Sequence, residues 1–143
     1  TLRLKQWQAD VQLDGGHPVG VRLIVDVDSL EVVKGEGGLT PMGAAEKMLA
    51  RKNALKCLKA DKHPRITYVS SAVQRDGDSY AVTGELTIGG ATVAHPLTVV
   101  ADGSSFRCES PVLQTTFGLK PYSQMMGALK VVDEVVVDIS ATL

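Results

Sequence analysis

Apolar and polar residues alternate along most of the chain, and glycine-rich turns separate the alternating segments. The clearest example is Tyr80–Val100, YAVTGELTIGGATVAHPLTVV. A period of two predicts a β-strand with one buried face, and the Gly89–Gly90 pair predicts a hairpin. Thr83, Glu85 and Thr87 fall on the opposite face. The residues expected to face inward are Tyr80, Val82, Gly84, Leu86, Ile88, Leu97 and Val99.

Other segments show the same alternation, including Leu2–Leu13, Val19–Val27, Ile66–Ala72 and Val135–Leu143. In the first of these the apolar phase slips by one residue near Gln6, which predicts a bulge or a bend. Short strands separated by turn signals predict an all-β antiparallel fold, either a sandwich or a barrel. Further residues expected to face inward are Trp7, Leu23, Val25, Tyr68, Ser70, Ala72, Ala101, Phe106 and Cys108.

One helix is expected, at about Pro41–Leu58, with Thr40 as its N-cap and Pro41 in its first turn. The preceding glycine-rich segment, KGEGGLTP, lacks the Gly-Lys-Ser/Thr ending of a phosphate-binding loop and is interpreted as a connector. The apolar stripe of the helix indicates a face that packs on the core, with Met48 as a filler side chain. Its members are Ala45, Met48, Leu49, Leu55 and Leu58, and Lys52 interrupts it.

The segment Gln114–Val135 does not read as a strand. It holds many of the aromatic and sulfur side chains, namely Phe117, Tyr122, Met125 and Met126. Such a set forms an adaptable apolar surface that suits an irregular greasy ligand. The alternative is that the segment plugs one end of the barrel and completes the core. At the level of sequence both interpretations stay open.

Composition and charge narrow the function classes. The chain has 143 residues, 44% of them hydrophobic and 22% charged, with a formal net charge of -1. This length fits a single domain spanning residues 1–143, and the balance of charge argues against a nucleic-acid-binding protein. Lysines and arginines cluster between Lys47 and Lys62, where a solvated helix face is favoured over a site for an anionic partner.

No apolar run is long enough for a transmembrane helix. No signal peptide is visible, so a cytoplasmic location is favoured, with periplasmic and secreted locations left open.

Candidate chemistry is sparse. Cys57 and Cys108 form no disulfide framework, although a bridge between them is an open alternative. The three histidines lack the spacing of a zinc site, and neither a metal nor a cofactor is expected. Nor does a nucleophile motif occur. An enzyme would need a polar cluster in the pocket, and Tyr80, His95 and Cys108 are the candidates because they share the inward phase. We expect no catalytic activity.

Three blocks together resemble the YceI-like, polyisoprenoid-binding family: HPRITYVSSAVQ (His63–Gln74), YAVTGELTIGGATVAHPLTVVAD (Tyr80–Asp102) and TTFGLKPYSQMMGALKVVDEVVVDI (Thr115–Ile139). VDVDSLEV (Val25–Val32) resembles the strand that leads to the family's connector and helix. The similarity covers Val19–Leu143. It implies a lipocalin-like barrel of eight strands or fewer around a long apolar pocket, with isoprenoid chains as ligands.

The chain departs from the family pattern at several places. The family commonly has His-Gly where this chain has Gly89–Gly90, and the helix lacks the usual Arg-Asp…His pattern. These departures resemble a divergent, actinobacterial-type branch. The family's first strand is expected to be missing before Thr1, which leaves an open edge and makes a homodimer an alternative.

The predicted function is therefore to bind or carry an isoprenoid or other lipid inside a barrel. Valine and alanine dominate the inward positions, which leaves room for a ligand, and each buried methylene contributes about 0.8 kcal/mol. The alternative is a filled barrel that serves as a structural or protein-interaction module. The predicted ligand-binding residues are Trp7, Leu23, Val25, Tyr68, Tyr80, Val82, Leu86, Leu97, Val99, Phe106, Phe117, Tyr122, Met125 and Met126.

Overall fold

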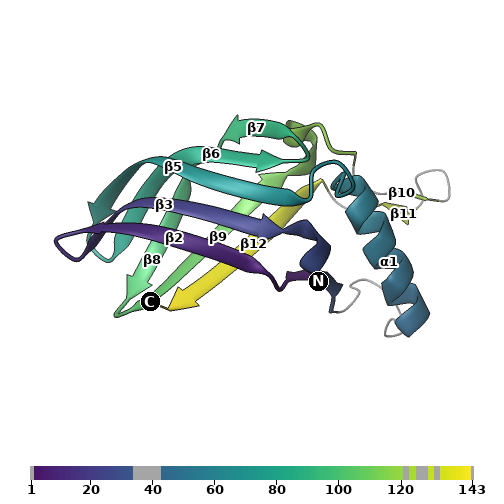
Figure 1. Cartoon of the computed structure of the whole chain (residues 1–143), viewed down its shortest axis with the longest axis horizontal. Coiled ribbons are helices and arrows are strands. Elements are labelled where there is room, and N and C mark those ends of the chain that lie inside the picture. Colours follow the sequence, from purple (N-terminus) through teal and green to yellow (C-terminus); the bar gives the residue numbers. More distant parts are fainter. Residues whose placement is uncertain (1, 34–42, 121–122, 125–128, 131–132, 143) are drawn as a thin grey trace.

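Most of the chain forms one antiparallel sheet that curls into a half-barrel (Figure 1). The computed structural model describes residues 2–33, 43–120, 123–124, 129–130 and 133–142. The strand order is β12-β9-β8-β6-β5-β3-β2, and β7 also pairs with β6. The all-β prediction is confirmed. The strands are β2 (Trp7–Asp14), β3 (His17–Asp26), β5 (Arg65–Asp76), β6 (Ser79–Ile88), β7 (Ala91–Ala94), β8 (Leu97–Asp102), β9 (Ser105–Leu113) and β12 (Glu134–Thr142).

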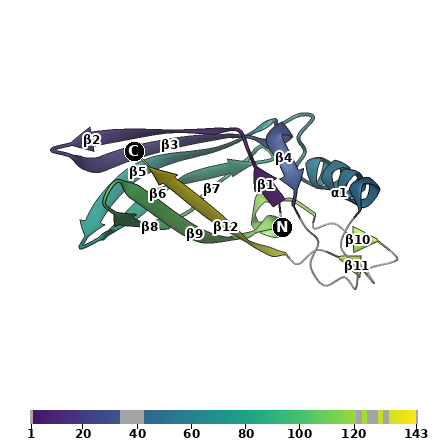
Figure 2. The same cartoon turned by 90° about the horizontal axis from the view of Figure 1, so that it is seen from below.

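The half-barrel has two free edges. β2 and β12 are the two edge strands of the curled sheet (Figure 2), and among the described strands no backbone pairing joins them. Two short strand pairs lie outside the main sheet: β1 (Leu2–Leu4) with β4 (Leu30–Val32), and β10 (Ser123–Gln124) with β11 (Leu129–Lys130). The phase slip predicted near Gln6 falls at the break between β1 and β2, where the chain leaves one sheet for the other.

Strand register places apolar residues in rows across the inner surface, which we call the concave face. One row runs Leu23–Tyr68–Leu86–Val93 across β3, β5, β6 and β7. The prediction that Ala72 faces inward is wrong. A bulge between Ser70 and Ala72 shifts the alternation, so Val73 pairs with Val82 and Ala72 is exposed. The buried core on this face consists of Tyr68, Tyr80, Val82, Leu86, Ile88, Val112, Phe117 and Leu119.

The hairpin between β6 and β7 turns at the predicted glycines. Gly89 and Gly90 have φ of 58° and 84°, a region that favours glycine. A Cβ at Gly89 would lie 2.9 Å from the Leu119 side chain, and one at Gly90 would lie 2.7 Å from the His63 ring. This turn is therefore packed between neighbours, and a side chain at either glycine would require Leu119 or His63 to shift.

Helix α1 (Ala44–Cys57) lies at one end of the half-barrel, beside β4 (Figures 1 and 2). It begins at Ala44 with Gly43 as N-cap, so the prediction of Thr40 as N-cap is wrong. The expected core-facing stripe is formed only in part: Leu55 is half-buried and Leu58 packs against the core, but Met48 is 73% exposed and Leu49 58% exposed. The physical reason is that the helix stands beside the sheet instead of covering it, and no residue of α1 is buried.

Candidate functional site

The concave face of the half-barrel is apolar and only partly covered. Partly buried apolar residues of this face pack against its buried core, and each of them keeps some contact with solvent. The exposure is greatest at the free edges, where Trp7 on β2 is 42% exposed although it pairs with the buried Val25. The half-buried set on this face is Val21, Leu23, Ile66, Val73, Val93, Leu97, Val99, Ala101, Phe106 and Val135. A concave apolar surface that is incompletely covered suits an apolar ligand that can follow its curvature.

The structure brings most of the predicted ligand-binding residues to this face. Leu23, Leu97, Val99 and Phe106 are half-buried members of it, and Trp7 lies at its edge. The buried residues of the predicted set are Val25, Tyr68, Tyr80, Val82, Leu86 and Phe117. The remaining three, Tyr122, Met125 and Met126, lie outside the described residues.

One end of the half-barrel is filled. The turn η2 (Gln114–Phe117) places Phe117 in the core at 2% exposure, and Leu119 follows it there. At the base of this segment the Asp133 carboxylate accepts hydrogen bonds from the Thr115 hydroxyl at 2.7 Å and the Thr115 amide at 2.9 Å. These hydrogen bonds lower the pKa of Asp133. The beginning of the Gln114–Val135 segment therefore completes the core, which favours the plug interpretation for Phe117.

A polar cluster interrupts the apolar surface. The His95 ring atom Nε2 lies 2.6 Å from Ser110 Oγ, and the Tyr68 hydroxyl donates to the His95 carbonyl at 2.7 Å. Ser110 on β9 is 7% exposed and is the one buried polar residue of the described chain. Sequence reasoning missed it. The available signal was a serine at an inward position, in phase with Phe106, Cys108 and Val112.

Local backbone geometry explains why His95 sits here. His95 and Pro96 join β7 to β8, and both strands pair with the same edge of β6. Between the two ladders the His95 amide donates to the Gly84 carbonyl at 2.9 Å, which continues the pairing where proline could not donate. The Tyr68 ring lies against Gly84, since a Cβ there would be 2.8 Å from the hydroxyl end of the ring.

Burial sets the protonation states of the cluster. It lowers the pKa of His95 below its usual 6.5, which favours the neutral imidazole. Burial, with a smaller effect of the nearby Cys108, raises the pKa of Tyr68 to about 12, so its hydroxyl keeps its proton. The cluster thus offers neutral donors and acceptors, and it is suited to hydrogen bonding with an uncharged group.

Tyr80, His95 and Cys108, the residues that an enzyme would need as a polar cluster, do not hydrogen-bond one another. Tyr80 and Cys108 flank Val99 in one row of the concave face. Among the described residues, however, no hydrogen bond links either of them to His95, whose ring is paired with Ser110 instead. The arrangement can position a polar group, but these three side chains do not form a relay.

The two cysteines are separate thiols. Cys57 is half-buried near the end of α1, and Cys108 is buried on β9. Burial raises the pKa of both thiols, and the charge of Asp138 raises that of Cys108 further. In the described part of the chain, no three side chains of His, Cys, Asp or Glu are placed to share a metal ion.

A second concavity lies outside the half-barrel, between α1 and the β1–β4 pair, with a volume of about 330 Å³. The Arg51 guanidinium crosses it and donates to the Leu30 carbonyl at 2.9 Å and the Asp28 carbonyl at 2.6 Å. Its lining is strongly charged, which makes it a poor site for an apolar ligand, and we place the candidate site on the concave face instead. The lining residues are Lys5, Ser29, Leu30, Glu31, Val32, Lys47, Met48 and Arg51.

Known structures share this architecture. The crystal structure of BcnA from Burkholderia cenocepacia superposes with a TM-score of 0.73 at 23% identity, covering 99% of this chain and 87% of that one. The YceI protein of Campylobacter jejuni superposes with a TM-score of 0.66 at 16% identity, covering 100% and 84%. At these identities the likeness shows the fold.

Sequence relatives agree with the structures. A family model described as the YceI-like domain matches residues 1–143, a wider span than the resemblance found from the sequence blocks. A UPF0312 protein of Pectobacterium atrosepticum is 49% identical over 35 residues, which are 24% of this chain and 18% of that relative. One of Pectobacterium carotovorum is 46% identical over the same shares. Neither is actinobacterial, and the predicted actinobacterial branch is not confirmed.

Proposed function

The chain belongs to the YceI-like family, and from that premise we propose that it binds a long apolar ligand, of the isoprenoid class, along the concave face of its half-barrel. The observation that carries the proposal is the row of half-buried apolar side chains on that face, which is open to solvent beside β2 and β12. A ligand laid there would cover Trp7 and the half-buried residues together. Burial of this apolar surface is the driving force.

Chain length supplies the affinity. Each methylene buried contributes about 0.8 kcal/mol, reduced by the cost of ordering the ligand. A flexible prenyl chain therefore binds without a charged anchor, and longer chains bind more tightly until the face is covered. Because apolar burial is not directional, the affinity should depend little on the detailed shape of the chain.

The polar cluster gives the ligand a preferred head group. Tyr68, His95 and Ser110 hydrogen-bond one another, and His95 is kept neutral by burial. A charged phosphate placed against them would lose its hydration, and none of these three side chains is positively charged to compensate. An uncharged hydroxyl or carbonyl, as in a prenyl alcohol or a quinone, fits this chemistry better.

Mass spectrometry of organic extracts from natively purified protein tests the proposal. The expected result is a prenyl or similar lipid at near-stoichiometric amount. The variant Val99→Phe fills the concave face, while Val100→Phe adds the same volume to the next residue of β8, which is half exposed on the outer surface. Loss of lipid from Val99→Phe alone supports the site, and equal lipid in both variants contradicts it.

An interaction module is the second candidate, and the free edges of β2 and β12 favour it. Unpaired edge strands present backbone donors and acceptors that another strand can engage. Light scattering discriminates the two functions. A dimer that forms without lipid, and that a proline substitution at Val136 on β12 abolishes, would support strand pairing between copies of this chain.

A further inference from the structure

Helix α1 carries a stripe of side chains that are all exposed. Residues spaced by three and four along a helix share one face, and here all five members of that face are exposed. Met48 and Leu49 are among the most exposed large apolar side chains of the protein. We name this set the outer stripe of α1, and it consists of Ala45, Met48, Leu49, Lys52 and Lys56.

The outer stripe is cationic as well as apolar. Lys52 and Lys56 have no ion pair among the described residues, and the stripe contains no acidic residue. Arg51, by contrast, points to the other side of the helix and is bound to the β4 region. Glu46, the acidic residue of the first turn, lies off the stripe.

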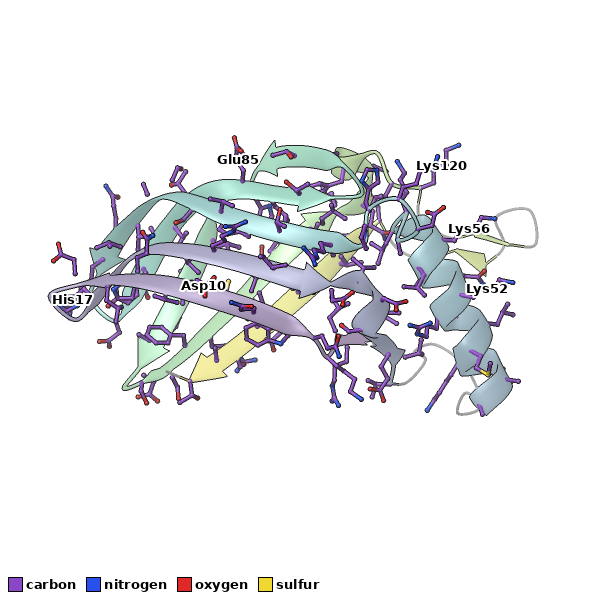
Figure 3. The ribbon with its side chains drawn as sticks, viewed as in Figure 1. Asp10, His17, Lys52, Lys56, Glu85 and Lys120 are labelled. Atoms are coloured by element: carbon purple, nitrogen blue, oxygen red, sulfur yellow. The ribbon has the colours of Figure 1, made fainter. Side chains whose placement is uncertain are left out.

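The surroundings extend this charge. Figure 3 shows Lys52, Lys56 and Lys120 at the same end of the molecule, opposite the end that carries His17. Lys59 and Lys62 follow α1 in an exposed turn, together with one acid, Asp61. Around the outer stripe these four lysines of α1 and the following turn therefore outnumber the nearby acids Glu46 and Asp61, although the whole chain has a formal net charge of -1.

We propose that the outer stripe of α1 docks the protein on the surface of an anionic lipid bilayer, with Met48 and Leu49 at the level of the acyl boundary and the lysines at the head groups. Anionic head groups attract the unpaired lysines of the outer stripe, and the exposed Met48 and Leu49 beside them can enter the interface. An acidic protein partner is the weaker fit, because cores of protein interfaces are depleted in lysine. No described helix is long and apolar enough to cross the bilayer.

Vesicle co-sedimentation tests the charge component. The probes are vesicles of phosphatidylcholine alone and of phosphatidylcholine with equal phosphatidylglycerol. Lys52→Gln/Lys56→Gln removes two charges from the outer stripe, and Arg22→Gln/Arg65→Gln removes two from exposed positions on β3 and β5. The expected result is selective binding to anionic vesicles that falls about tenfold or more in the lysine variant and little in the arginine variant.

A second pair of variants tests the apolar component. Met48→Ser/Leu49→Ser is compared with Val100→Ser/Val136→Ser, which alters equally apolar exposed positions on outer strand faces. Only the helix variant is expected to weaken vesicle binding, and circular dichroism checks that α1 persists. Equal binding to neutral and anionic vesicles, or equal loss in test and control variants, overturns the proposal. So does lysine-dependent binding to soluble polyglutamate without any binding to vesicles, which points to an acidic protein.

Discussion

The ring of His95 and the hydroxyl of Ser110 meet at 2.6 Å on a face whose other buried side chains are apolar. The contact joins the β7–β8 junction to β9, two parts of the sheet that share no backbone pairing at this point. It is reinforced by the Tyr68 hydroxyl, which holds the His95 backbone carbonyl at 2.7 Å. These hydrogen bonds connect parts of the sheet that are not paired. In the proposed function the same cluster contacts the ligand head group.

Replacing Ser110 with alanine should separate these two roles. The substitution leaves the half-buried His95 Nε2 without its partner, and we expect a loss of about 1–3 kcal/mol in the free energy of unfolding. Urea denaturation measures it, with Ser140→Ala on the exposed face of β12 as control. Affinity for a prenyl alcohol should fall more than affinity for the matching hydrocarbon. An equal change for both ligands would show that the cluster does not contact the head group.

The lowered pKa of His95 predicts a dependence of stability on pH. The folded protein resists protonation of this ring more than the unfolded chain, whose pKa is near 6.5. The contribution to stability is therefore complete above that pH and decreases as the pH falls toward the folded pKa. Unfolding free energies measured from about pH 7 to pH 5 should decline less in His95→Gln than in the parent protein. His17→Gln serves as control, and an unchanged slope in His95→Gln would contradict the prediction.

Gly84→Ala should be strongly destabilising. A Cβ there would lie 2.5 Å from the Val69 carbonyl oxygen and 2.8 Å from the Tyr68 ring, and neither group can move freely. We expect a cost of about 1–3 kcal/mol from overpacking. At Gly20 a Cβ would meet only the end of the flexible Gln12 side chain, so Gly20→Ala should stay within about 0.5 kcal/mol of the parent. Thermal unfolding of both variants provides the comparison, and equal effects would argue against this packing of Tyr68.

Cys108 should report on occupancy of the concave face. Its thiol is buried there, whereas Cys57 is half-buried at α1, and burial raises the pKa of both thiols. In the native protein we expect iodoacetamide to modify Cys57 faster than Cys108, and a bound prenyl ligand to slow only the modification of Cys108. Peptide mass spectrometry follows both sites. Protection of Cys57 without protection of Cys108 would place the ligand elsewhere.

The sequence predicts the strands of the half-barrel well, because each of them has one buried and one exposed face. Tyr80–Ile88 shows this most clearly, since every second residue is buried as expected. The exception at Ala72 follows from a bulge, which inserts a residue without any glycine or proline to mark it. Register across strands depends on such local irregularities, and a period-two pattern does not reveal them.

Helix α1 and the polar cluster were harder to predict. The apolar positions of the helix resemble a core-facing stripe, but only its end reaches the core, where Leu58 packs, while Met48 and Leu49 stay exposed. The sequence of one element does not show which surfaces its neighbours already cover. Likewise, the contact of His95 with Ser110 links residues on separate strands, and its existence depends on the twist and curvature of the sheet.

The central claim is that the concave face binds long apolar chains, and Trp7 allows it to be measured directly. Trp7 is the one tryptophan of the chain and lies partly exposed at the edge of that face. Titration with prenyl alcohols of ten, fifteen and twenty carbons should shift its fluorescence to the blue, with affinity rising by about tenfold or more per added unit. The Val99→Phe variant should lose this response while Val100→Phe retains it. Affinity that does not depend on chain length, or an unchanged Trp7 spectrum with every alcohol, would contradict binding on the concave face.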